Sequence, residues 1–267
     1  MIKFFRKIRH DLMEQNKTGK YFKYAIGEII LVVIGILIAL QINNWSEGIK
    51  NGNTEQEFYK EILSDLEKDN IKLEGLTEFY NNRIEHAGWL LKKVRKPIGS
   101  INKLEFGQHV EPLYIGPIPV IFNSSFEAAK SSGAFALFEN KEILKQLNQY
   151  YTNFEELKGI MAATLRFLET RLEPIMATVP INYVKKETGV YVITSELQDL
   201  KELYTFLDAI KDERKILVDL NVILQNPAFE SYLSGDLGRS FNALTSIEIR
   251  KEQLNKIKTE IKHYVSN

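Results

Sequence analysis

The sequence YAIGEIILVVIGILIALQINNW, from Tyr24 to Trp45, decides the fold of this chain. Only two of the 18 residues that follow Tyr24 are polar, Glu28 and Gln41. An 18-residue helix is about 27 Å long, which is close to the thickness of the hydrocarbon layer of a bilayer. A soluble helix of this length normally has a polar face, and this stretch has none. The pattern therefore predicts a transmembrane helix over residues 24–45.

The residues at the two ends of this stretch predict its depth and orientation. Tyr24 and Trp45 flank it, and such amphipathic rings favour the headgroup layer as membrane anchors. Residues 1–23 carry seven basic side chains and two acidic ones, whereas the first basic residue after the span is Lys50. Basic flanks stay in the cytoplasm. We therefore expect an inner-membrane protein with a cytoplasmic N-terminus and a periplasmic domain over residues 46–267.

Cleavage as a signal peptide is the competing interpretation of the same stretch. The apolar run is long for a signal peptide, and Ala39-Leu40-Gln41 matches a cleavage site poorly. The sequence favours an uncleaved signal anchor.

One face of the predicted span is a candidate site. Gly35 and Ala39 form a small-x-x-x-small pair, which lets two helix backbones approach closely. Glu28, Gly35 and Ile42 are spaced by sevens and share this face. The face predicts association with a second copy or with a protein partner in the membrane. An acid inside a span is also a candidate for ion coupling. Alternatively, Glu28 lies near the cytoplasmic surface of the membrane and pairs with a lysine there.

Residues 1–23 are predicted to form a basic amphipathic cytoplasmic segment. Ile2, Phe5, Ile8 and Leu12 recur at helical spacing, with lysine and arginine opposite them. Such a helix can lie on an anionic leaflet. The basic residues can equally serve only as the topology signal.

The run YAIGEIILVVIGILIALQINNWSE, after the basic MIKFFRKIR, resembles the N-terminal signature of a large family of bacterial single-span membrane proteins of unknown function. A weaker similarity continues in FEAAKSSGAFALFENKEILKQLNQYY, over residues 126–151. The resemblance implies the single-span topology and an all-helical outer domain. It implies no activity and no catalytic residues.

The composition of the remaining chain limits its chemistry. The whole chain has 35 basic and 35 acidic residues, so the net charge of +5 on residues 1–23 leaves −5 for the rest. A mildly acidic domain argues against nucleic acid as a partner. The absence of cysteine excludes disulfides, iron–sulfur clusters and thiolate zinc sites.

Hydrophobic periodicity predicts an all-α bundle of about four long helices. The first is expected from 54 to 97, after a break at Asn51-Gly52-Asn53 and a capping box from Thr54 to Glu57. Asp69 interrupts its apolar stripe once. The other three are expected at 141–173 with an Asn140 cap, at 195–224 after a second capping box, and from Asn226-Pro227 to the C-terminus.

Three segments between these helices are predicted to be irregular or short. Residues 97–123 are rich in proline and glycine, with a short helix at 102–110 that Asn102 caps. Within them PLYIGPIPVIF, residues 112–122, is predicted to be an extended hydrophobic strap across the bundle, because its prolines exclude a central strand. A partner-binding loop is the functional alternative. A short helix is expected to end at Gly133, and residues 177–194 are predicted to form a loop or a small hairpin.

No catalytic, cofactor or metal motif is recognisable in the sequence. The four histidines are scattered, and His86 is interpreted as a half-exposed surface residue. We therefore expect a non-enzymatic, membrane-anchored interaction protein that acts as an oligomer or as a subunit of a membrane complex. A ligand-sensing helical domain that works with a partner, and an ion-coupled accessory subunit that uses Glu28, are the alternatives; a small-molecule ligand is not expected.

Overall fold

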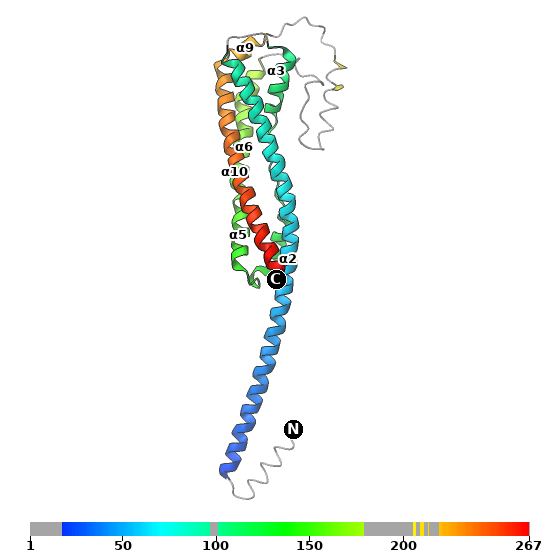
Figure 1. Ribbon diagram of the computed structural model, residues 1–267, viewed down its shortest axis with the longest axis vertical. Helices are drawn as coiled ribbons and strands as arrows, with labels where there is room; N and C mark the ends of the chain where they lie inside the picture. Colours follow the sequence, from blue (N-terminus) through cyan, green and yellow to red (C-terminus); the bar gives the residue numbers. More distant parts are fainter. Residues whose placement is uncertain are drawn as a thin grey trace. The chain divides into compact units, whose positions relative to one another are not determined.

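A computed structural model describes residues 18–96, 101–178, 205–206, 209–210, 213 and 219–266, and within these ranges it contains helices and no strand (Figure 1). The predicted all-α class is confirmed. The chain divides into two compact units, one made of Met1–Glu57 with Ala136–Glu139 and the other of Phe58–Phe135 with Asn140–Asn267. Residues 1–17 of the predicted amphipathic segment lie outside the described residues, and residues 18–23 already belong to the long helix α2.

Helix α2 (Thr18–Val94) begins in the first unit and ends in the second. The predicted helix start at Thr54 is wrong, because α2 is continuous through Asn51, Gly52 and Asn53. The Thr54 hydroxyl instead donates to the carbonyl of Lys50 at 3.0 Å, which is a bond of the helix interior. One glycine costs a helix only about 1 kcal/mol, so a long helix passes through it.

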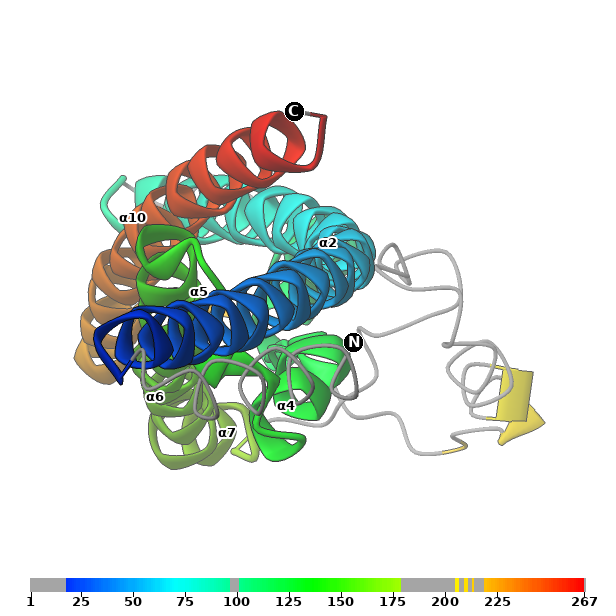
Figure 2. The same cartoon turned by 90° about the horizontal axis from the view of Figure 1, so that it is seen from below.

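The second unit is a bundle in which α2 packs beside two other helical columns. One column is α5 (Lys141–Thr152) followed by α6 (Phe154–Phe167), and the other is α10 (Pro227–Ser266). Figure 2 shows α5 and α6 beside α10. The contacts fix the register. Residues of α2, together with Arg95 directly after it, meet α10 in antiparallel order. The pairs are Arg95–Glu230, Thr77–Glu248, Glu67–Lys258 and Tyr59–Tyr264.

The column predicted as one helix over 141–173 is broken and longer. Asn140 caps α5 as predicted, accepting from the amide of Ile143 at 3.1 Å. The column breaks at Asn153, passes through a π-helical turn η3 (Leu168–Leu172), and ends in α7 (Glu173–Met176). Pro174 does not end it, because a proline in the first turn of a new helix loses no hydrogen bond there.

The segment between α2 and α5 runs back along α2. It contains α3 (Lys103–Val110), η1 (Glu111–Tyr114), α4 (Ser124–Ser131) and η2 (Ala134–Ala136). Asn102 caps α3 as predicted, by accepting from the amide of Glu105 at 2.7 Å. Gly133 has a φ of +76°, in the left-handed region that favours glycine, so the predicted stop after α4 is confirmed. The strap begins in η1, and its residues 115–122 have no regular secondary structure.

Most of residues 177–194, predicted as a loop or a small hairpin, and most of the predicted helix at 195–224 lie outside the described residues. The end of that run forms α9 (Asn221–Leu224). Asn226 then accepts from the amide of Ala228 at 2.9 Å and Pro227 is the first residue of α10, so the predicted start of this helix is confirmed.

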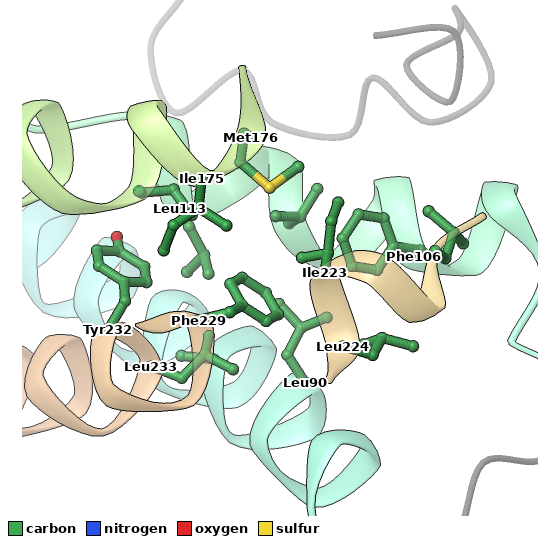
Figure 3. Close-up of a cluster of buried hydrophobic side chains, with 14 of the residues drawn as sticks. Leu90, Phe106, Leu113, Ile175, Met176, Ile223, Leu224, Phe229, Tyr232 and Leu233 are labelled. Carbon is green, nitrogen blue, oxygen red and sulfur yellow. The ribbon is translucent and has the colours of Figure 1, made fainter. Parts of the chain in front are cut away.

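The core of the second unit lies where α3, η1, η3, α7, α9 and α10 meet α2 (Figure 3). Burial of apolar area drives this packing. Its fully buried members include Leu90, Phe106, Leu113, Leu172, Phe229 and Leu233. The predicted stripe of the long helix is buried at nearly every position from Tyr59 to Leu90.

Candidate functional site

The first candidate site is the apolar stretch of α2. Among the described residues, α2 is the one helix long and apolar enough to cross a membrane, and none of its apolar stretch is buried. Twelve large hydrophobic side chains between Ile26 and Ile42 are each about half exposed. Removing such an array from water is favourable by on the order of 10 kcal/mol. The segment therefore has the length, composition and exposure of a membrane span.

The residues predicted as an interface lie on one side of this stretch. With 3.6 residues per turn, Glu28, Gly35, Ala39 and Ile42 fall within an arc of about 60°. The side chains of Ala39 and Ile42 are exposed, and a Cβ added at Gly35 would meet nothing within 4 Å. A single chain thus leaves this side open at Gly35 and Ala39.

The two predicted membrane anchors also fall within α2. Trp45 is 70 % exposed. The side chain of Tyr24 lies outside the described part of the structure.

The second unit contains a buried cluster that sequence reasoning missed, which we call the Arg83 clamp: Arg83, Asp236 and Tyr232. The guanidinium of Arg83 and the carboxylate of Asp236 approach to 2.7 Å, and both side chains are almost completely buried. The remaining donors of Arg83 reach three strap carbonyls, those of Pro112, Leu113 and Ile115, at 3.4, 3.1 and 2.7 Å. The clamp therefore ties α2, the start of the strap and α10 together.

A second buried carboxylate holds the other end of the strap. Asp69 accepts from the amide of Phe122 at 2.7 Å and from the hydroxyl of Tyr150 at 3.0 Å. Burial raises the pKa of Asp69, and these two hydrogen bonds oppose that shift. One turn earlier, Asp65 accepts from the amide of Ser125 at 3.0 Å, at the start of α4. The stripe interruption at Asp69 was the sequence signal for this contact.

Arg250 of α10 completes this second cluster. Its Nη1 donates to the carbonyl of Tyr150 at 2.7 Å, and its guanidinium lies 3.7 Å from the centre of the Tyr150 ring. Burial lowers the pKa of Arg250, while Tyr150 and Asp69 oppose that shift. Tyr150 is thus both a buried core residue and a polar link, because it contacts Asp69 and Arg250.

The structure brings together two histidines that the sequence places far apart. The Nδ1 atoms of His86 on α2 and His109 on α3 lie 2.8 Å apart. The interpretation of His86 as half-exposed is wrong, because its side chain is only 9 % exposed. Trp89 stacks on His109 with ring centres 3.8 Å apart. A tetrahedral zinc would hold two nitrogens about 3.4 Å apart, so this spacing fits a hydrogen bond better.

Four buried charged residues of the second unit, Asp65, Asp69, Arg83 and Arg250, bind the chain's own backbone. Among the described residues, no group of three or more histidine, aspartate or glutamate side chains is arranged to hold a metal ion. The geometry of the Arg83 clamp and of Asp69 accounts for the fixed course of the strap along α2.

Residues 28–109 match a family of unknown function, DUF6090. The match covers less than half of the chain and contains Glu28, Arg83, His86 and His109. The resemblance to a family of unknown function is supported over these residues. No curated protein matches the chain, and no solved structure matches it.

Proposed function

We propose that the protein is a non-enzymatic, membrane-anchored interaction protein of the bacterial cell envelope. The single observation that carries this proposal is the exposed apolar stretch of α2, which lies in the same chain as a helical bundle. The interior of that bundle binds its own strap. Its outer surface is then the part available to a partner protein.

The orientation of the chain in the membrane follows from the charges that flank the span. Residues 1–23 carry a basic excess, and the positive-inside rule places such a flank in the cytoplasm. The bundle then lies in the periplasm and the span in the inner membrane. Fusions of alkaline phosphatase and of green fluorescent protein after Asn267 test this arrangement. Phosphatase activity with a dark fluorescent fusion is expected, and the reverse pattern contradicts it.

The open side of the span is the proposed contact with a second copy. Gly35 and Ala39 let two helices approach closely, and no described residue lies within 4 Å of a Cβ added at Gly35. Because the chain has no cysteine, single cysteines report this contact cleanly. Oxidation of Ala39→Cys in native membranes is expected to give disulfide-linked dimers. Leu37→Cys, on the opposite side, is the matched control. Equal crosslinking of both variants, or of neither, contradicts the proposed interface.

Membrane anchoring is tested by extraction of membranes with alkaline carbonate. The wild-type chain is expected to stay in the pellet. Ile34→Arg combined with Ile38→Arg places two charges in the span, each costing about 2.5–3.5 kcal/mol near its centre, and is expected to release the chain. Ile249→Arg, at an exposed position of α10, is the control and should stay in the pellet. A wild-type chain that is soluble without detergent overturns the proposal.

A further inference from the structure

The His86–His109 pair is a direct polar link between α2 and α3. The two Nδ1 atoms are 2.8 Å apart, and the rings are 4.9 Å apart between centres. Linear alignment of two imidazoles at this distance separates the centres by about 5 Å, which is consistent with a hydrogen bond along the line between the nitrogens. Trp89 covers His109 on one face. The link thus joins two elements that lie 23 positions apart in the sequence.

This hydrogen bond depends on the number of protons that the pair carries. One nitrogen must donate and the other must accept, so at least one imidazole has to be neutral. A second proton removes the last acceptor. It also places two positive charges less than 3 Å apart at a site that is partly buried. The doubly protonated pair therefore cannot keep the contact.

Among the described residues, the charged groups around the pair only partly offset a second charge. The charged groups of described residues that act on the pair are Glu85 and Lys93 on α2 and Glu105 on α3. Lys93 and Glu105 face each other at 3.7 Å, so they largely offset one another. Burial lowers the pKa of His86, with Glu85 opposing it, and burial together with His86 lowers the pKa of His109.

We propose that His86 and His109 form an acid-sensitive latch that fastens α3 to α2 at neutral pH and releases it on acidification. The release ends at η1, because Arg83 holds the carbonyls of Pro112, Leu113 and Ile115 independently of the histidines. The latch thus weakens the docking of the short helix, whose Phe106 and Val110 are still buried in the core, while the strap stays in place.

The sign of the pH dependence follows from the protons bound. The unfastened state has ordinary imidazoles with a pKa of about 6.5, whereas the fastened state resists protonation. The unfastened state therefore binds more protons in acid. Docking of α3 is complete above about pH 6.5 and weakens as the pH falls below it.

Hydrogen–deuterium exchange of the full chain in detergent, at pH 7.5 and pH 5.0 and corrected for intrinsic exchange rates, tests the latch. The amides of α3 are expected to lose protection at least tenfold at pH 5.0, while those of α10 keep theirs. The double variant His86→Gln with His109→Phe keeps a ring against Trp89 and is expected to remove the difference. His263→Gln, near the end of α10, is the matched control and should behave as wild type.

Protection of α3 that is equal at both pH values in the wild type overturns the latch, as does an unchanged pH difference in the double variant. A second measurement holds even if that variant misfolds. In a Trp45→Phe chain, Trp89 is the one tryptophan left. Its emission is expected to change with a midpoint below pH 6.5, as His109 gains a proton and leaves the stack. An emission that stays constant from pH 7.5 to 4.5 also overturns the proposal.

Discussion

At the scale of single residues, two charges on the buried side of α2 decide where the strap lies. Asp69 and Arg83 are two heptads apart and hold opposite ends of the strap, through Phe122 and through Pro112 to Ile115. Removing a charge from water costs several kcal/mol unless it is paired and hydrogen-bonded. Arg83 is paired with Asp236 in this way. The carboxylate of Asp236 and the surrounding phenols stabilise the charged guanidinium, so the pKa of Arg83 is raised although burial opposes this.

Breaking the Arg83 clamp is expected to destabilise the bundle strongly. Asp236→Asn leaves the buried guanidinium without a counter-charge, which typically costs about 3–5 kcal/mol. Urea unfolding of the full chain in detergent, followed by circular dichroism, measures this. The matched control is Glu230→Gln, which removes the exposed ion pair with Arg95 and should cost less than about 1 kcal/mol. Similar losses in both variants contradict the assigned role of the clamp.

At the scale of elements, local signals predicted the helix ends that are set by local chemistry. Asn102, Asn140 and Gly133 cap or stop helices as their residue types predict, because each acts on a backbone within three residues of itself. Thr54 is also of a residue type that favours helix caps, but it does not cap a helix here. Its hydroxyl finds a partner in the carbonyl of Lys50, because the apolar stretch before it already propagates the helix.

The difference between local and long-range contacts also explains why the sequence could not predict the buried contacts of Arg83 and His86. Arg83 and Asp236 are 153 positions apart, and His86 and His109 belong to different elements. Periodicity identifies which side of α2 is buried, and so it marked Asp69 as an interruption. It does not say which segment arrives there, because that depends on the register between helices.

Replacing two glycines of α10 by alanine is expected to change the stability of the bundle in opposite directions. At Gly238 a Cβ meets nothing within 4 Å, so Gly238→Ala should stabilise the bundle by about 0.5–1 kcal/mol through helix propensity. At Gly235 the Cβ would lie 2.8 Å from the ring of Phe167, which is stacked on Tyr232 and covered by Arg239. Gly235→Ala is therefore expected to cost about 1–3 kcal/mol. Thermal unfolding measures both, and a gain in both variants would contradict the packing described.

At the scale of the molecule, buried phenols limit stability in alkali. Burial raises the pKa of Tyr80 to about 12, and the pKa values of Tyr150, Tyr151 and Tyr232 are raised as well. The unfolded chain releases these protons near pH 10 while the folded chain retains them. The free energy of unfolding therefore falls as the pH rises through 10.

Tyr80→Phe isolates one of these contributions. Between pH 9.5 and pH 11 the variant is expected to lose about 1 kcal/mol less stability than the wild-type chain, in parallel urea titrations. Equal losses would mean that the Tyr80 phenol ionises as readily in the folded state as in the unfolded state.

Helix α10 follows every other described helix in the chain, and this order has a consequence for biosynthesis. Asp236, the counter-charge of Arg83, and Arg250, which contacts the Asp69 cluster, are therefore translated after their partners. Until then the guanidinium of Arg83 lacks its counter-charge, because Asp236 has not yet been translated. A message truncated before α10 therefore yields a product with an unpaired charge in its interior, and we expect that product to be degraded.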